Sequence, residues 1–160
     1  MAMLLELRDV TIAFAGRAER ASVVAEHLDI GLRAGRMHCV TGARGTGKTS
    51  VLRVAAGLLR PTAGSVSWNG EELGTLSDDA LSIRRGGLLG YVDQAGALID
   101  ELSVLENVLL PAIPRRAAAA LGPRAHELLG ELGVASLAAM RPAELTPGER
   151  TRVAVALAAA

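Results

Sequence analysis

Apolar and polar residues alternate along the first part of the chain, as they do in half-buried β-strands. Residues 4–11 alternate in this way and predict one strand, and residues 22–32 predict a second. Two short apolar runs, residues 37–41 and 88–92, predict two further strands. The first of these runs leads directly into a glycine-rich segment, and the second ends just before Gln94.

Later segments change to helical spacing or carry turn signals. Ser103 and Thr146 are each followed three residues later by glutamate, which is the capping-box pattern that opens a helix. Gly122-Pro123 predicts a break within another helical stretch. Asn69-Gly70 predicts a hairpin turn after a short strand at residues 65–68. The predicted helices are residues 48–56, 77–85, 103–110, 115–133 and 146–160.

The composition is that of a globular domain. The chain has 160 residues, half of them apolar, and its formal net charge is zero, which provides no general attraction for nucleic acid or anionic lipid. Its single cysteine, Cys39, excludes an internal disulfide and is expected in the core. The longest apolar stretch, residues 153–160, is far shorter than the roughly 20 residues that span a bilayer. We therefore expect a cytoplasmic protein that reaches a membrane, if at all, through a partner.

The glycine-rich segment carries the clearest chemistry. Residues 42–49 read GARGTGKT, which fits the phosphate-binding pattern G-x-x-x-x-G-K-[ST]. Lys48 is the single lysine among 17 basic residues, so it stands where a compact ammonium does what a planar guanidinium cannot. The predicted strand before the loop and helix after it are the context that this motif requires. The pattern predicts a nucleoside triphosphate site.

Each residue of the loop has an expected role. The backbone of the six residues before the lysine would wrap the phosphates, because glycines allow close approach of the main chain. Lys48 would neutralise the β- and γ-phosphates, Thr49 would bind Mg²⁺, and Ser50 would add a hydrogen bond. The predicted cradle consists of Gly42, Ala43, Arg44, Gly45, Thr46 and Gly47.

Three further segments resemble the ATP-binding cassette (ABC) family, the ATPase subunits of ABC transporters. Residues 90–108, GYVDQAGALIDELSVLENV, resemble the family's Q-loop and the helix after it, with Gln94 at the glutamine position. Residues 144–159, ELTPGERTRVAVALAA, resemble the signature segment, usually LSGGQ or LSGGE. Phe14 lies where the family places an aromatic residue that stacks on adenine. The segments LSVLENVLLP and 141–144 are similar to the lipoprotein-release and macrolide-export group.

The resemblance implies a partial α/β cassette in residues 1–160. Its fold would combine a RecA-like P-loop core and an antiparallel β subdomain (1–95) with a helical subdomain (96–145) and the signature helix (146–160). Gln94 would contact Mg²⁺ and the attacking water. A second cassette, identical or different, would present its ATP to the signature residues Leu145, Thr146, Pro147, Gly148 and Glu149. A transmembrane permease would be the other partner.

The chain also departs from the family's pattern. Pro147 replaces a signature glycine and has no N–H to offer a phosphate, although a helix tolerates proline at its first position. The family continues to a strand ending in Asp-Glu and then to a switch histidine, and these residues are absent here. We therefore expect the isolated chain to hydrolyse ATP poorly.

The departures leave other functions open. One alternative is an inactive half-cassette that binds ATP or pairs with an intact cassette. A DNA-repair or translation ATPase is disfavoured by the neutral charge and the lack of basic stripes and zinc-type cysteines. A small-molecule kinase would not explain the segment around Thr146.

Overall fold

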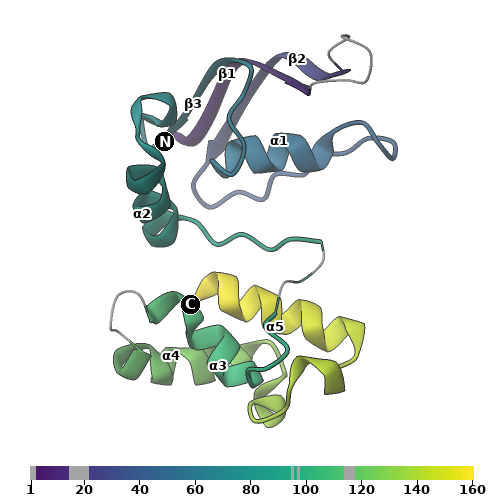
Figure 1. Cartoon of the computed structure of the whole chain (residues 1–160), viewed down its shortest axis with the longest axis vertical. Coiled ribbons are helices and arrows are strands. Elements are labelled where there is room, and N and C mark those ends of the chain that lie inside the picture. Colours follow the sequence, from purple (N-terminus) through teal and green to yellow (C-terminus); the bar gives the residue numbers. More distant parts are fainter. Residues whose placement is uncertain (1–2, 15–21, 95, 97, 114–117) are drawn as a thin grey trace. The chain divides into compact units, whose positions relative to one another are not determined.

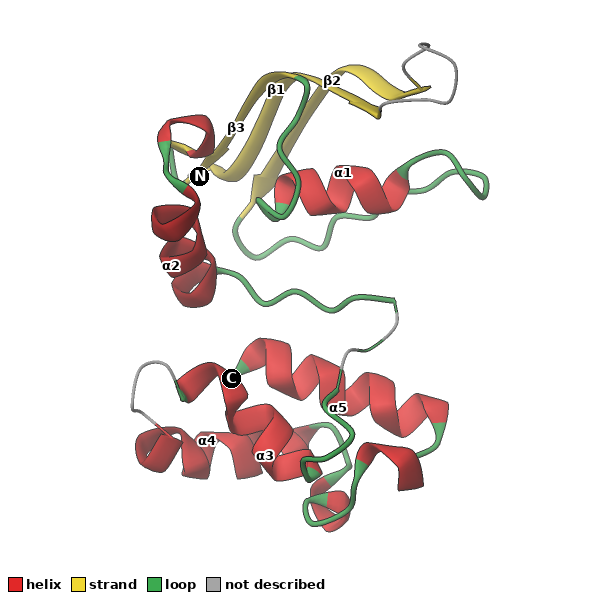
Figure 2. Cartoon of the chain, in the orientation of Figure 1, coloured by secondary structure: helices red, strands yellow, loops and turns green. Residues whose placement is uncertain are grey.

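A computed structural model of the chain describes residues 3–14, 22–94, 96, 98–113 and 118–160. The chain forms two compact units, Met1–Arg85 and Gly86–Ala160. Sheet strands belong to the first unit, and the second contains helices α3, α4 and α5 (Figures 1 and 2). The predicted combination of an antiparallel sheet with a helical part is confirmed.

The first unit contains a four-stranded antiparallel sheet in the order β2-β1-β3-β4. Its strands are β1 (Met3–Phe14), β2 (Ser22–Arg33), β3 (Ala63–Trp68) and β4 (Glu71–Glu72). The Asn69-Gly70 turn joins β3 to β4 with a positive φ at both positions, 49° and 83°, which confirms the predicted hairpin.

The alternation in β1 changes phase in the middle of the strand. Leu5 and Leu7 are buried on one side of the change, and Val10 and Ile12 on the other. The register with β2 shifts between Leu7 and Val10, where Asp9 has a φ of 51°. An extra residue at such a bulge turns the following side chains back to the buried face.

Helix α1 (Lys48–Ala55) covers the buried face of this sheet (Figure 2). Val51 and Val54 point into the core, and the indole of Trp68 donates a 2.9 Å hydrogen bond to the carbonyl of Ala55. The guanidinium of Arg85 in α2 (Asp78–Leu88) donates to the Gly57 carbonyl at 2.7 Å. These donors satisfy carbonyls at the end of α1 and hold the helix in place.

The second unit is built from α3 (Val104–Leu109), α4 (Ala118–Glu131) and α5 (Pro147–Ala159). Short 3₁₀ turns lie between and beside them, including Pro142–Glu144 before α5. Both predicted capping boxes are present, because Ser103 and Thr146 each exchange hydrogen bonds with the glutamate three residues later. The core of this unit consists of Val104, Val108, Ala125, Leu128, Leu129, Val134, Leu145, Val153 and Ala156.

Two strand predictions and one helix break are wrong. Residues 37–41 and 88–92, predicted as strands, have no strand structure, because no described strand pairs with them and Leu88 is the last residue of α2. Cys39 is exposed rather than buried. Helix α4 continues through Pro123. Its buried residues Ala125, Leu128 and Leu129 pack in the helical core, and this packing outweighs the cost of an interior proline, about 3 kcal/mol.

Among the described residues, no helix is both long and apolar enough to cross a bilayer.

Candidate functional site

The glycine-rich loop between β2 and α1 has the backbone that a phosphate cradle requires. Gly45 and Gly47 have φ values of 82° and 81°, a region that residues with a Cβ rarely adopt. Residues 42–46 are exposed to solvent, so their main chain is accessible to a ligand. The loop therefore combines an accessible backbone with two positions that glycine alone occupies without strain.

Lys48 folds back over this loop. Its ammonium donates hydrogen bonds to the carbonyl oxygens of Gly42, at 3.0 Å, and of Ala43. Thr46 reinforces the turn by donating from its hydroxyl to the Ala43 carbonyl at 2.9 Å. The ammonium thus lies at the centre of the loop, where phosphate oxygens would replace the carbonyls as stronger, charged acceptors.

The start of α1 adds the field of a helix N-terminus. Gly47 is the N-cap and has no side chain to accept from the first-turn N–H groups, and the first turn carries no acidic residue. Those N–H groups and the helix dipole consequently favour an anion. Thr49 is exposed and Ser50 half-buried in the first turn of α1, and their contacts with Mg²⁺ and phosphate stay predictions.

Strand β2 contacts the loop through Val24. A Cβ built on Gly47 would overlap the side chain of Val24, so glycine is needed here for space as well as for φ. Val24 was not among the residues predicted for the site, and its place in the predicted second strand is the only sequence signal that points to it. Phe14 pairs with Ser22 at the end of β1 and is 41% exposed, while its neighbour Ala13 pairs with Val23. Phe14 is thus an exposed aromatic residue at the end of β1 that pairs with the start of β2, the strand that carries Val24. This position fits the predicted adenine contact, which stays a prediction.

The signature-like residues 145–149 lie at the start of α5. Leu145 is buried, whereas Thr146, Pro147 and Gly148 are exposed. Thr146 is the N-cap and Pro147 the first helical residue, as predicted. The Thr146 hydroxyl donates to the Glu149 carboxylate at 2.7 Å and accepts from the Glu149 N–H at 3.4 Å.

The same capping contacts act on the charge of Glu149. Hydrogen bonds from the Thr146 side chain, and then from its backbone, lower the pKa of the Glu149 carboxyl below its ordinary value. The carboxylate thus stays ionised at the N-terminal end of α5, while Gly148 has open space around its Cα. The Thr146 hydroxyl is engaged with Glu149, whereas Gly148 is exposed and leaves its main chain accessible to a ligand.

Gln94 lies in an irregular turn of the second unit and is exposed. Its backbone N–H donates a 2.7 Å hydrogen bond to the carboxylate of the adjacent Asp93. The structure therefore brings Phe14 and residues 42–50 into one unit, and Gln94 and residues 145–149 into the other. The predicted joint action of these two groups stays a prediction.

Comparison with known sequences points to one family. The sequence pattern of the ABC transporter family matches residues 25–160. The lipoprotein-releasing system ATP-binding protein LolD of Syntrophotalea carbinolica is 38% identical over 158 residues, which are 98% of this chain and 69% of that protein. LolD of Geobacter metallireducens is 39% identical over 162 residues, which are 99% of this chain and 70% of that protein. The pyoverdine export ATP-binding/permease protein PvdT of Pseudomonas putida is 36% identical over 156 residues, which are 97% of this chain and 24% of that protein.

Solved structures agree with the sequences. The dimeric structure of a bacterial ABC transporter cassette matches with a TM-score of 0.87 and 28% identity, over 96% of this chain and 68% of that one. A post-hydrolysis state of the same kind of cassette, bound to ADP and Pi, matches with a TM-score of 0.83 and 26% identity, with the same coverage of both chains. The chain thus spans about two thirds of the length of the LolD proteins and of these solved cassettes.

Proposed function

The chain belongs to the ABC transporter family and is an ATP-binding subunit of that family of ATPases, and we propose that residues 42–50 hold the triphosphate of its ATP. The observation that carries this proposal is the position of Lys48, whose ammonium lies over the loop on the carbonyls of Gly42 and Ala43. An ammonium held there neutralises phosphate charge with little movement of the backbone.

The residues at the start of α1 have two roles in the proposed site, one toward the phosphates and one toward Mg²⁺. The N–H groups of the first turn and of the loop donate to phosphate oxygens, and the helix dipole favours their negative charge. The exposed hydroxyl of Thr49 suits Mg²⁺, which prefers hard oxygen ligands and keeps several waters. Mg²⁺ would neutralise charge on the β- and γ-phosphates during phosphoryl transfer. Gln94 is the proposed further Mg²⁺ contact.

The partners follow from the same family membership. We propose that a second cassette, identical or different, faces residues 145–149 and that its ATP contacts Thr146 and Gly148. The dimeric state of the solved cassette supports this arrangement. A transmembrane permease is the proposed second partner, which would keep the chain at the cytoplasmic face of the membrane, and nucleic acid is not a proposed partner. The similarity to LolD supports the lipoprotein-release group as the subtype.

Pro147 supports a second candidate, an ATP-binding half-cassette with little turnover. Proline at the first position of α5 keeps the helix start intact but supplies no N–H to a phosphate. Such a chain would still bind ATP at residues 42–50 and pair with an intact cassette. Turnover measured beside binding distinguishes the two candidates.

The proposal is tested by calorimetric titration of the full 160-residue chain with Mg²⁺-ATP, with and without Lys48→Ala. We expect the variant to lose at least tenfold in affinity, since a hydrogen bond to a charged group contributes about 1.5–3 kcal/mol. Arg124→Ala is the matched control, because it also removes an exposed cation, but one that lies in the other unit, where it pairs with Glu127 and Glu131 of α4. Equal affinity for the folded wild type and Lys48→Ala would overturn the proposal.

A further inference from the structure

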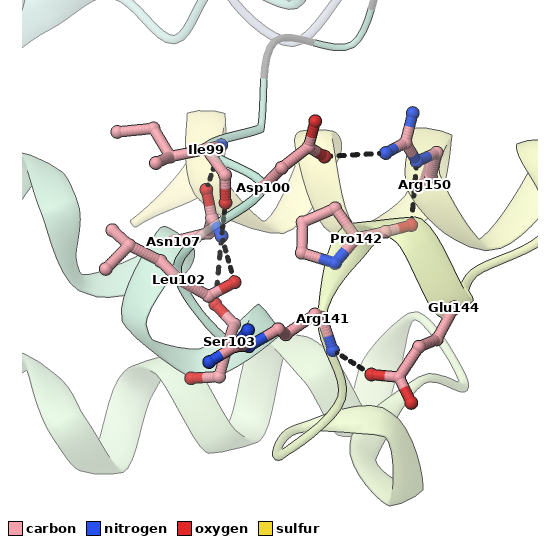
Figure 3. Close-up of polar contacts among 9 residues, drawn as sticks. All are labelled: Ile99, Asp100, Leu102, Ser103, Asn107, Arg141, Pro142, Glu144 and Arg150. Carbon is pink, nitrogen blue, oxygen red and sulfur yellow. Dashed lines mark hydrogen bonds and ion pairs between the residues drawn. The ribbon is translucent and has the colours of Figure 1, made fainter.

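Arg150 bridges two segments that lie far apart in the sequence. It lies in the first turn of α5, and its N–H donates to the carbonyl of the N-cap Thr146 at 2.9 Å. Its side-chain Nε donates to the Pro142 carbonyl at 2.9 Å, and its Nη2 donates to the Asp100 carboxylate at 2.8 Å (Figure 3). One guanidinium therefore joins the start of α5 to the turn before it and to residues 99–103.

Residues 99–103 are themselves held rigidly by Asn107. This asparagine of α3 is fully buried, and its Oδ1 accepts from the N–H of Ile99 at 2.7 Å. Its Nδ2 donates to the carbonyls of Ile99, Leu102 and Ser103 at 3.1, 3.2 and 2.9 Å (Figure 3). A buried amide with all its partners fixes one local conformation, so residues 99–103 move together with α3.

The other end of the bridge is equally well held. Pro142 is fully buried in the 3₁₀ turn before α5, and the N–H of Arg141 donates to the Glu144 carboxylate at 2.7 Å. This turn leads into buried Leu145 and the N-cap Thr146. From the first turn of α5, Arg150 thus contacts both this turn and Asp100.

We infer that Arg150 is a positioning residue that couples residues 99–103 to residues 145–149, so that a displacement of the first segment is transmitted to the second. The consequence for ATP rests on the proposed function, in which Thr146 and Gly148 contact the ATP of a second cassette. Residues 99–103 follow Gln94 closely in the chain. Ile99 is 45% exposed, and the side chain of Asp100 is 65% exposed. A partner that contacts this exposed segment would thereby adjust the signature residues.

Arginine suits this role better than lysine would. Its fork of donors reaches a carbonyl and a carboxylate at once, whereas an ammonium acts as a single point charge. The Asp100 contact is half-exposed and thus weak in itself, while the Pro142 contact is partly buried. The bridge therefore combines a weak, exposed ion pair with a partly buried hydrogen bond at the start of α5.

Hydrogen exchange of the full chain, followed by mass spectrometry, tests this coupling. Asp100→Asn removes the charge but keeps the shape of a residue that is mostly exposed. We expect exchange in residues 146–152 to accelerate about two- to fivefold, as loss of a surface ion pair predicts, with residues 155–159 unchanged. In an Arg150→Gln background, Asp100→Asn should have no further effect. Arg124→Gln, which removes another ion-paired arginine of the same unit, should change neither segment.

Three results would overturn the inference. These are unchanged exchange in Asp100→Asn, an equal acceleration in both backgrounds, and a uniform acceleration across the unit, which would indicate a general loss of stability. The measurement needs no nucleotide, so its failure is distinguishable from failure of the proposed function. If Lys48→Ala left ATP affinity intact while the exchange pattern appeared as expected, the coupling would stand without its link to ATP.

Discussion

A 3.0 Å hydrogen bond joins the ammonium of Lys48 to the carbonyl of Gly42, the first residue of the phosphate-binding pattern. The same ammonium also donates to the carbonyl of Ala43, so the side chain lies back over the loop. Phosphate oxygens of a ligand would take over the donors that these two carbonyls now use. The size and reach of the cation at position 48 therefore matter as much as its charge.

Lys48→Arg should lower ATP affinity although the charge is kept. The planar guanidinium is too broad to donate to the Gly42 and Ala43 carbonyls from one point inside the loop. We expect a loss of about tenfold or more, corresponding to one hydrogen bond to a charged group. Titration with Mg²⁺-ATP measures it, and affinity equal to that of the wild type would show that charge alone is sufficient.

Gly47→Ala should destabilise the first unit. Gly47 has a φ of 81°, and an added Cβ would overlap the Val24 side chain. Left-handed backbone and overpacking each cost roughly 1–2 kcal/mol, so we expect a clear fall in the midpoint of urea unfolding. Gly130→Ala is the contrast, because a Cβ there meets nothing and alanine is the better helix former. That variant should be more stable by up to about 1 kcal/mol.

Pro147→Gly should change stability and partner binding in opposite directions. Glycine increases the conformational freedom of the unfolded chain, so the free energy of unfolding should fall by about 1 kcal/mol. The new N–H at the start of α5 should strengthen Mg²⁺-ATP-dependent association with a second cassette. Sedimentation of the chain with and without Mg²⁺-ATP checks this. Tighter association without nucleotide would point to a contact other than phosphate.

The helical unit should lose stability in acid. Hydrogen bonds from the backbone and side chain of Ser103 lower the pKa of Glu106, and those from Thr146 lower that of Glu149. Because the folded pKa values lie below the ordinary value of 4.5, the unfolded chain binds more protons between the two values. The stabilisation is present above about pH 4.5 and disappears as the pH falls through the folded pKa values. Chemical unfolding at several pH values should show this, and Glu149→Gln should reduce the slope.

His27 should respond to pH in the opposite sense. Its Nδ1 lies 2.6 Å from the Asp9 carboxylate, and this hydrogen bond raises the pKa of His27 above 6.5. The resulting stabilisation of the β1–β2 pair is full below pH 6.5 and is lost as the pH rises through the folded pKa. NMR titration of His27 measures the shift, and Asp9→Asn should return the pKa toward the ordinary value. An unchanged pKa in that variant would exclude Asp9 as the cause.

Local signals in the sequence predicted the parts of the structure that depend on neighbouring residues. The capping boxes at Ser103 and Thr146 and the Asn69-Gly70 turn formed as predicted, because each satisfies its own backbone within four residues. The glycine loop followed from the same kind of signal, since its spacing of glycines and lysine is a requirement of the local backbone.

Predictions that depended on distant partners were less successful. Residues 37–41 are apolar, but a strand also needs a hydrogen-bonded neighbour, and none of the described strands supplies one. The prediction of a helix break at Pro123 is wrong, because packing of Leu128 and Leu129 in the core stabilises α4 as one helix.

The sequence by itself determined the glycine-rich loop before α1, the helix starts at Ser103 and Thr146 and the family to which the chain belongs, because these depend on residue type at short spacing. The tertiary structure decided that Val24 confines Gly47 and that Arg150 joins Asp100 to Pro142. Val24 and Gly47 are 23 positions apart in the sequence, and Asp100 and Arg150 are 50 positions apart. Patterns over a few neighbouring residues do not predict which distant side chains will be in contact.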